Sequence, residues 1–256
     1  MENAIKQLIG ECCGCVSVSV NSRPGGRICI DSESQMQAAS TIKLALLFEA
    51  CRQIGNGTLS GSQRIAFEST ATGGAGIVDH LESLNELNLW DVLTLMIIVS
   101  DNAASNVVLD LLGKENINKA CCDLGMKRTA VERHFMDFNA AEKGFDNRTS
   151  ASDMVRLMEA FAVPGVLPER ERRRALDILG KQQSRKLTAA IEEEEVQFYG
   201  KAGELAGLQA DVGMFKQGEN FTIAAVFVEG ADHPLAAHQM IAKVGLLIHQ
   251  HMTLKV

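Results

Sequence analysis

The sequence predicts an α+β protein in which strands from both ends of the chain form one antiparallel sheet. Three observations support this fold class. Apolar residues alternate near the N-terminus and again after residue 195, the residues between these regions repeat at spacings of three and four, and the chain closes with an apolar-faced helix. Because the strands lie at the two ends, the helical middle is an insertion.

Length and composition narrow the possible classes of protein. The 256 residues fit one large domain or two closely packed ones, and a hydrophobic fraction of 46% is enough for a core. No apolar run approaches the roughly 18 residues of a membrane-spanning helix. The formal net charge of −7 argues against binding to nucleic acid. We therefore expect neither a membrane nor a nucleic-acid partner.

The N-terminal part of the sheet is predicted to be a hairpin that follows a short helix at residues 2–10. Residues Cys15–Val20 alternate with a period of two, which is typical of a strand. The turn residues of Asn21–Gly26 come next, and Arg27–Asp31 forms the second strand.

The C-terminal part of the sheet is predicted from apolar segments separated by turn residues. These strands are Val196–Tyr199, Lys201–Glu204, Ala210–Phe215 and Phe221–Val228. The acidic run Glu192–Glu195 before them is expected to be a solvated turn or helix end, and His238–Met252 is the closing helix. We place the sheet subdomain at residues 1–35 and 190–256.

The all-helical subdomain is expected at residues 36–189. Helical periodicity, capping residues and terminal glycines predict helices at Ser40–Gln53, Trp90–Val99, Ala103–Leu112, Asn118–Leu124, Ser150–Phe161 and Pro168–Leu179. The polar segment Arg128–Thr149 lacks periodicity and is predicted to be a long loop. Long loops in compact domains are often functional.

The seven cysteines and the N-terminus bear on redox state and location. An odd number of cysteines without a secretory segment indicates reduced thiols. Cys12, Cys13 and Cys15 are clustered, but adjacent strand positions point to opposite faces and suit a metal site poorly. Met1–Gly10 does not resemble a signal peptide. We expect a cytoplasmic protein without a metal, or an exported one if a leader precedes this sequence.

Three short motifs follow one another along the chain: Ser40-Thr41-Ile42-Lys43, Ser100-Asp101-Asn102 and Lys201-Ala202-Gly203. Each motif alone is common. The first usually marks only the start of a helix, the second a turn or a helix cap, and the third has almost no meaning by itself. We do not treat the three motifs as chance matches, because each lies in the expected order and spacing and on a suitable predicted element. In the folded protein this arrangement would bring their serines and lysines together in one cleft.

These residues together could form and stabilise an acyl-enzyme. Residues three apart on a helix share a face, so Lys43 can remove the proton of the Ser40 hydroxyl if burial lowers the lysine pKa. Ser100 can relay a proton to a leaving nitrogen, while Asn102 contacts a substrate amide. Lys201 can attract a substrate carboxylate. The backbone N–H groups of Ser40 and Glu204 would form an oxyanion hole.

The motif set resembles that of class A β-lactamases, and the resemblance covers nearly the whole chain. It implies a β-lactamase/DD-peptidase-like fold, with a five-stranded antiparallel sheet flanked by helices, an all-helical subdomain, and the active site between them. It also implies that Ser40 is acylated, Lys43 activates it, Ser100 relays a proton, and Asn102 and Lys201 bind substrate. No cofactor is implied.

The region Arg133–Ser150 resembles the omega loop of that family, and Asn139 stands at the position of the loop's asparagine. The family has a glutamate four residues earlier, which activates the water that releases the acyl group. Here that position is Phe135. Asp137 or Glu132 would have to replace the base if the loop is rearranged.

Two other positions depart from the family pattern. Ala202 stands where relatives have threonine or serine, whose hydroxyl binds the substrate carboxylate. By the same resemblance, the following residues Gly203 and Glu204 are expected to bind substrate. In the loop, the expected acidic partner of Arg133 is replaced by Arg148, and Asp146 is the alternative partner.

The sequence therefore favours a monomeric serine hydrolase that acts on a small β-lactam, peptide or ester and deacylates slowly. The alternatives are a D-alanyl-D-alanine peptidase or small esterase on the same fold, and a penicillin-binding protein without enzymatic activity. A glutaminase is disfavoured because Ser-Asp-Asn is not expected there.

Overall fold

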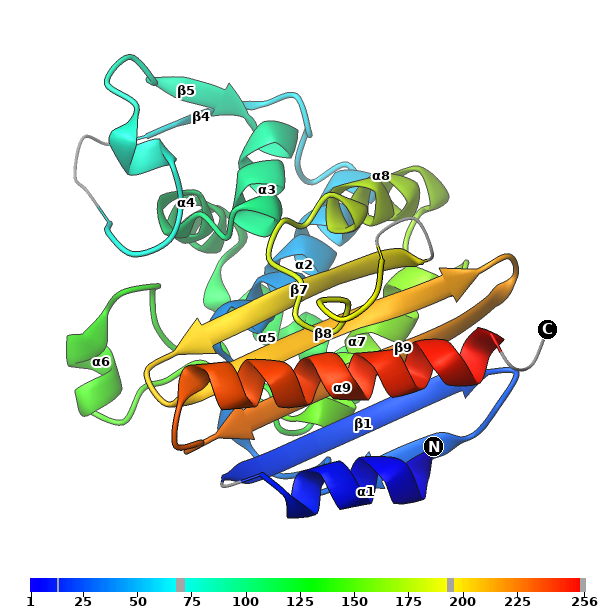
Figure 1. Ribbon diagram of the computed structural model, residues 1–256. Helices are drawn as coiled ribbons and strands as arrows, with labels where there is room; N and C mark the ends of the chain where they lie inside the picture. The colour runs from blue at the N-terminus through cyan, green and yellow to red at the C-terminus, as the bar shows by residue number, and fades with distance from the viewer. Residues whose placement is uncertain (13, 68–71, 193–195, 254–256) are drawn as a thin grey trace.

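The computed structural model describes residues 1–12, 14–67, 72–192 and 196–253. Its main feature is a five-stranded antiparallel sheet in the order β2-β1-β9-β8-β7 (Figure 1). The strands are β1 (Cys15–Arg23), β2 (Arg27–Ile30), β7 (Gln197–Leu205), β8 (Leu208–Gln217) and β9 (Asn220–Glu229). The predicted pairing of the two chain ends into one sheet is confirmed.

The two chain ends are joined by the long antiparallel ladder between β1 and β9, in which Cys15 is opposite Glu229 and Arg23 is opposite Phe221. The ladder also corrects the turn expected at Asn21–Gly26. Asn21–Arg23 continue β1, because their pairing with Phe221–Ile223 of β9 outweighs the local turn preference of polar residues. β7 lies at the opposite edge of the sheet, where β8 is its one strand partner among the described residues.

Helices cover both faces of this sheet. On one face lie α1 (Glu2–Gly10) and α9 (Pro234–Thr253), which pack on each other and over the sheet (Figure 1). Against the other face pack α7 (Ala151–Ala162) and α8 (Glu169–Gly180). Within the described residues, no helix is both long and apolar enough to cross a membrane.

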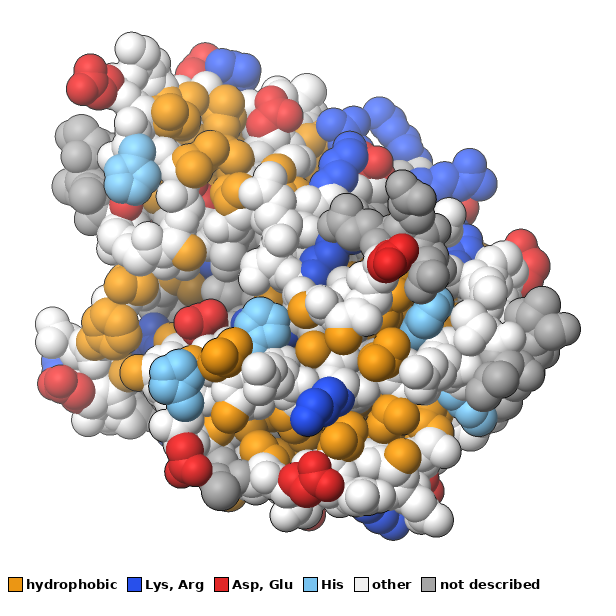
Figure 2. Space-filling model, in the orientation of Figure 1, with side chains coloured by type: hydrophobic (Ala, Val, Ile, Leu, Met, Phe, Trp, Pro, Cys, Tyr) orange, Lys and Arg blue, Asp and Glu red, His pale blue; other side chains and the backbone are white. Residues whose placement is uncertain are grey.

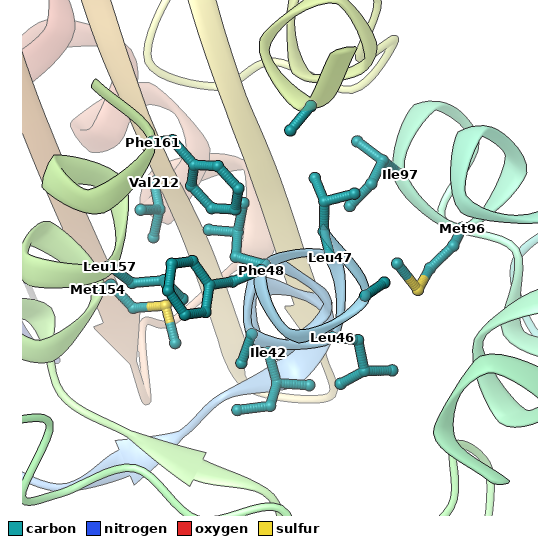
Figure 3. Close-up of a cluster of buried hydrophobic side chains, with 14 of the residues drawn as sticks. Ile42, Leu46, Leu47, Phe48, Met96, Ile97, Met154, Leu157, Phe161 and Val212 are labelled. Atoms are coloured by element: carbon teal, nitrogen blue, oxygen red, sulfur yellow. The ribbon is translucent and has the colours of Figure 1, made fainter. Parts of the chain in front are cut away.

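The helical middle of the chain surrounds α2 (Lys43–Gly55), whose side chains are buried on nearly all sides. Around it lie α3 (Leu89–Ile98), α4 (Asn102–Leu112) and α5 (Lys114–Asp123). Figure 3 shows α2 contributing Leu46, Leu47 and Phe48 to the core, with α7 on one side and α3 on the other. This apolar packing fixes the helix that begins at Lys43.

The region predicted as one loop contains regular structure. Within Arg128–Thr149 lie the short helix α6 (Phe138–Glu142) and the short strand β6 (Arg148–Thr149), which pairs with β3 (Met36–Gln37). A second small sheet joins β4 (Arg64–Ala66) to β5 (Glu86–Asn88). Strands of two or three residues are too short to show a period-two pattern, so the sequence did not predict them.

Two further expectations concern the start of α7 and the strand before β8. Ser150 caps α7 by accepting a hydrogen bond from the Asp153 N–H at 3.2 Å, as the capping residues predicted.

The two short strands expected before β8 form the single strand β7, with Gly200 inside it. A Cβ at Gly200 would approach the Val212 carbonyl oxygen to 2.5 Å, so only glycine fits this pairing. Of the acidic run 192–195, residues 193–195 lie outside the described residues.

Candidate active site

Ser40 lies in a single 3-10 turn, η1 (Ala39–Ile42), that leads directly into α2. The predicted helix start was therefore early by three residues, because η1 precedes the first α-helical position. The turn packs against β7. A Cβ at Gly203 would lie 3.2 Å from the Ser40 nitrogen and 3.0 Å from the Thr41 side chain, so the glycine permits this close approach. The edge of β7 is thereby placed beside the Ser40 backbone.

Lys43 connects the first two motifs. Its side chain is fully buried, and Nζ donates to the Ser100 carbonyl oxygen at 2.7 Å, to Ser100 Oγ at 3.1 Å and to Asn102 Oδ1 at 2.9 Å. Burial lowers the pKa of Lys43 well below its usual value, and the charge of Lys201 lowers it further, while Asp101 acts in the opposite direction. The lowered pKa favours loss of one proton from the ammonium, and the resulting amine, which keeps two N–H donors, can accept a proton from a serine hydroxyl and pass it on.

Asp101, the middle residue of the second motif, holds this junction in shape. The carboxylate accepts hydrogen bonds from the N–H groups of Ile77 and Val78 at 2.7 and 2.9 Å, and it caps α4 through the Ala104 N–H at 2.9 Å. Ser100 has a φ of 57°, an uncommon conformation for a residue with a side chain. The bonds from Lys43 to Ser100 hold it there.

Lys201 lies at the start of the third motif, in β7, and is 1% exposed. Its Nζ donates to the Ala202 carbonyl oxygen at 2.9 Å. Burial lowers the pKa of Lys201 to about 7, an effect opposed by Asp211 and reinforced by Lys186. The ammonium is therefore a titratable cation near neutral pH.

Sequence reasoning missed two buried residues beside Lys201. Lys186 donates from Nζ to the Gly203 carbonyl oxygen at 2.9 Å and to the Ala210 carbonyl oxygen at 3.3 Å. Asp211 is completely buried and accepts the N–H groups of Lys186 and Leu187 at 2.7 and 2.8 Å. Lys186 lies in an irregular segment without a motif, so no sequence pattern marked it.

Two pockets meet at Ser40. The leaving-group pocket, as we name the larger one, has a volume of about 500 Å³ and is lined by residues that include Ser40, Ser100, Lys186, Lys201, Ala202 and Glu204. The acyl pocket, as we name the smaller one, has a volume of about 200 Å³ and is lined by residues that include Ser40, Asn102, Phe135, Met136, Phe138 and Leu205. Ser40, Ala75 and Glu204 line both, so a molecule bound to Ser40 could extend into each.

Phe135 lies inside the acyl pocket. Its ring centroid is 4.6 Å from Lys43 Nζ, and the residue is only 9% exposed. The Asn106 side chain of α4 fixes the backbone of Phe135. Its amide oxygen accepts the Phe135 N–H at 2.8 Å, and its amide nitrogen donates to the Phe135 carbonyl oxygen at 3.2 Å. The ring therefore adds an apolar surface beside the buried amine.

The structure does not bring the predicted loop asparagine to the site. Asn139 is exposed on α6, and the loop asparagine that lines the acyl pocket beside Asn102 is Asn147, which is 4% exposed. Asn147 accepts the N–H groups of Glu132 and Arg133 and donates to the Arg133 carbonyl oxygen. No sequence motif marked Asn147.

The two acidic candidates for a substitute base lie elsewhere. Asp137 caps α6 through the Ala140 N–H at 3.0 Å, and Glu132 accepts the Asp146 N–H at 3.2 Å. Neither residue lines the acyl pocket or the leaving-group pocket. The alternative ion pair of the loop is confirmed, because Arg133 Nε lies 2.7 Å from Asp146 Oδ1 with both side chains 8% exposed.

The side chains able to ligate a metal are dispersed over the described part of the chain. Among the described residues, no group of three or more His, Cys, Asp or Glu side chains is placed to hold a metal ion. Cys13 of the N-terminal cluster lies outside the described residues, while Cys12 is half-buried and Cys15 is exposed.

Comparison with known proteins identifies the family. A family profile described as "Beta-lactamase enzyme family" matches residues 1–252. This chain belongs to that β-lactamase family. No curated protein sequence matches the chain.

Solved structures show the same fold. The β-lactamase from Sphaerobacter thermophilus DSM 20745 is 24% identical, with a TM-score of 0.92 over 99% of this chain and 98% of that one. PBP-A is 23% identical, with a TM-score of 0.88 over 98% and 95% of the two chains. A point mutant of PBP-A, solved as an acyl-enzyme complex with penicillin G, is also 23% identical, with a TM-score of 0.88 over 98% and 96%. The predicted class A β-lactamase/DD-peptidase-like fold is confirmed.

Family and fold together support a serine hydrolase of the class A type.

Proposed function

We propose that this protein is a serine acyl-transfer enzyme that is acylated at Ser40 by β-lactams or related amides and esters and releases the acyl group slowly. The observation that carries the proposal is the contrast around Lys43. Its amine contacts Ser100 and Asn102 on one side and the ring of Phe135 on the other. The groups needed to form the ester are therefore present, while the side chain that faces them from the loop has no proton acceptor.

Acylation follows from these groups in a defined order. Neutral Lys43 takes the Ser40 hydroxyl proton, and the Ser40 oxygen attacks the substrate carbonyl carbon. The carbonyl oxygen becomes negative and is stabilised by the backbone N–H groups of Ser40 and Glu204. The C–N bond then breaks, and the nitrogen receives a proton through Ser100, which Lys43 contacts at 3.1 Å.

The substrate is bound by the residues of the third motif and by Asn102. The Lys201 ammonium attracts a carboxylate next to the leaving nitrogen, and the strand Ala202-Gly203-Glu204 aligns the substrate backbone along the edge of β7. Asn102 lines the acyl pocket and is tied to Lys43. Asn139, at the surface of α6, has no role in this proposal.

Deacylation requires a base that activates water beside the Ser40 ester. The acyl pocket contains a single carboxylate among its described lining residues, that of Glu204, whose side chain is 68% exposed and lies 4.0 Å from Lys186 Nζ. Phe135 fills the side of the pocket near Lys43 with an apolar ring. Water activation at the ester is therefore weak, and the acyl-enzyme persists.

A peptidase or esterase activity on the same site is the second candidate. The observation that favours it is Ala202, which offers no hydroxyl to a substrate carboxylate in the leaving-group pocket. Substrates without that carboxylate lose less from the missing hydroxyl.

The test is the intact-protein mass after incubation with benzylpenicillin, followed over hours, with Ser40→Ala as the control. We expect an adduct of the mass of benzylpenicillin on the unmutated protein alone, and we expect it to decay over hours. Consumption of benzylpenicillin without an adduct would contradict slow deacylation and direct the search to Glu204. No adduct and no consumption would contradict β-lactam acylation and leave the esters and peptides to be tested in the same way.

A further inference from the structure

We infer that Lys186 is a positioning residue for the oxyanion hole. Its ammonium polarises the peptide group between Gly203 and Glu204, and the N–H of that group stabilises the negative carbonyl oxygen of the substrate. Lys186 thus acts through the peptide group and not on the reacting atoms. The inference rests on the proposed function, because that function assigns the Glu204 N–H to the oxyanion hole.

The hairpin of β7 and β8 orients this peptide group. A two-residue loop joins the strands, so Leu205 and Leu208 flank the turn and form a hydrogen-bonded pair. Bonded and non-bonded pairs alternate along antiparallel strands, so Gly203 is again in a bonded pair and Glu204 is in a non-bonded one. The Gly203 carbonyl therefore points toward β8. The Glu204 N–H points away from β8, to the edge of β7 that has no strand partner among the described residues.

The same peptide group lies beside the nucleophile. A Cβ at Gly203 would lie 3.2 Å from the Ser40 nitrogen, so the two backbones are in close contact. Glu204 lines both pockets that meet at Ser40. The Glu204 N–H is therefore placed to donate to the carbonyl oxygen of a substrate that Ser40 attacks.

Lys186 contacts the opposite end of this peptide group. Its Nζ donates to the Gly203 carbonyl oxygen at 2.9 Å, and its side chain is 4% exposed. A hydrogen bond from an ammonium is roughly twice as strong as one from a neutral donor. The carbonyl and the N–H of one peptide group are joined by resonance, so a cation at the oxygen makes the N–H a stronger donor.

The hydrogen-bonding needs of the sheet do not account for Lys186. Its second acceptor is the Ala210 carbonyl oxygen at 3.3 Å, and Ala210 is the ladder partner of Gly203, so both carbonyl groups have backbone partners without it. Burying an ammonium costs free energy. Burial lowers the pKa of Lys186, while the carboxylates of Asp211 and Glu204 oppose this effect. A buried cation at this peptide group is therefore explained better by its electrostatic effect than by packing.

The position of Lys186 is fixed from β8. Asp211, which is completely buried, accepts the backbone N–H groups of Lys186 and Leu187 at 2.7 and 2.8 Å. These bonds attach the irregular segment before β7 to the sheet. The ammonium is thus held beside the peptide group before a substrate arrives, as electrostatic stabilisation of a transition state requires.

The infrared spectrum of the acyl-enzyme tests the inference, because the ester carbonyl band moves to lower frequency as hydrogen bonds to its oxygen strengthen. Benzylpenicillin labelled with ¹³C at the β-lactam carbonyl identifies this band by difference from the unlabelled adduct. The variant is Lys186→Met, which removes the charge and keeps a long unbranched side chain. We expect the ester band of Lys186→Met at higher frequency than that of the unmutated protein.

The rate constants give a second readout. We expect the limiting rate constant of acylation and that of adduct decay each to fall about tenfold in Lys186→Met, a part of the roughly hundred- to thousandfold lost with a whole oxyanion-hole donor. The half-saturating concentration should change much less. Because Lys186 also lines the leaving-group pocket, attraction of a carboxylate must be separated from this effect. The methyl ester of benzylpenicillin has no carboxylate and should lose the same factor.

Lys181→Met is the matched control. Lys181 follows α8, over which Figure 2 shows several Lys and Arg side chains at the surface. Its side chain is 60% exposed and lines neither pocket, so the same loss of charge should leave the band and the rates unchanged. Melting curves verify the fold. If Lys186→Met no longer melts cooperatively, Lys186→Gln is measured instead, and the same direction of shift is expected.

Each outcome decides one of the two proposals. An unchanged ester band in the folded variant, with adducts at Ser40, would overturn the role of Lys186 and leave the proposed function standing. A loss of rate confined to benzylpenicillin, with its methyl ester unaffected, would make Lys186 a carboxylate-binding residue and would also overturn the inference. No adduct from either compound on the unmutated protein would overturn β-lactam acylation itself, and the inference with it.

Discussion

The two sides of Ser40 differ in how completely they are equipped for catalysis. On one side, α2, the α3–α4 junction and β7 contribute Lys43, Ser100 and Lys201. Lys43 is hydrogen-bonded to Ser100, and Ser100 and Lys201 line the leaving-group pocket. On the other side, the loop 133–150 contributes Phe135, Met136 and Phe138. The first side is polar and titratable, and the second side is mostly apolar.

Under the proposed function, formation and hydrolysis of the acyl-enzyme depend on separate elements of this fold. The acylating groups stand on α2, the α3–α4 junction and β7, which pack into the core. The loop is held by its own contacts, chiefly the buried pair Arg133–Asp146 and the bonds of Asn147. A change in the loop can therefore remove water activation without disturbing the nucleophile.

The largest expected effect is at Lys43. Replacement by alanine removes the proton acceptor for Ser40, and we expect acylation by benzylpenicillin to slow by roughly a thousandfold, within the range for general base catalysis. The rate of adduct formation by mass spectrometry is the measurement. Lys43→Ala also leaves the Asn102 oxygen without its donor, so circular dichroism should verify the fold. A folded variant that acylates at the original rate would show that Lys43 is not the base.

The next effect is at Phe135, where the two sides meet. Phe135→Glu places a carboxylate beside the Ser40 ester, and we expect the adduct lifetime to shorten by roughly a hundredfold, since an added general base typically contributes about 10²–10⁴. The acylation rate should change much less. Asp137→Ala is the matched control, because that carboxylate caps α6 and should not affect the lifetime. A longer lifetime in Asp137→Ala, which would make that carboxylate the base, or an unchanged one in Phe135→Glu, would contradict the separation.

A smaller effect is expected at Ala202, on the acylating side. Ala202→Thr adds a hydroxyl to the leaving-group pocket, and a hydrogen bond to a charged group contributes about 1.5–3 kcal/mol. We expect acylation by benzylpenicillin to accelerate by roughly ten- to a hundredfold, measured at substrate concentrations below saturation. A neutral ester that lacks a carboxylate is the control and should react at the same rate with both proteins. Equal acceleration of the two substrates would rule out the carboxylate as the cause.

The sequence predicted the acylating side better than the loop, for a physical reason. Ser40 and Lys43 share one helix start, and Ser100 and Asn102 share one interhelical turn, so short-range spacing largely fixes their geometry. The loop residues depend on contacts between distant positions, such as Arg133 with Asp146. Counting along the chain therefore selected Asn139, which α6 turns to the surface, and missed Asn147. Lys186 and Asp211 were missed because only the folded sheet brings them to Lys201.

The smallest predicted effect is a pH dependence that separates charged from neutral substrates. The pKa of Lys201 is lowered to about 7, so its ammonium is present below that pH and is lost as the pH rises through it. Attraction of a substrate carboxylate should decline accordingly, and dividing by the rate constant of a neutral ester cancels any titration of Lys43, which affects both substrates. We expect the acylation rate constant of benzylpenicillin, relative to a neutral ester, to fall about fivefold between about pH 6 and pH 8, which corresponds to about 1 kcal/mol of attraction.

Lys201→Arg distinguishes this charge effect from other titrations in the site. Arginine stays protonated throughout this range, so the ratio between benzylpenicillin and the ester should no longer depend on pH. The second-order rate constant is the appropriate quantity, because it reports the pKa values of the free enzyme. A ratio that falls equally in Lys201→Arg would assign the titration to another group, and a flat ratio in the unmutated protein would mean that Lys201 does not recognise the carboxylate. The acylating side would then depend on Lys186, the other buried lysine that lines the leaving-group pocket, for its attraction of anions.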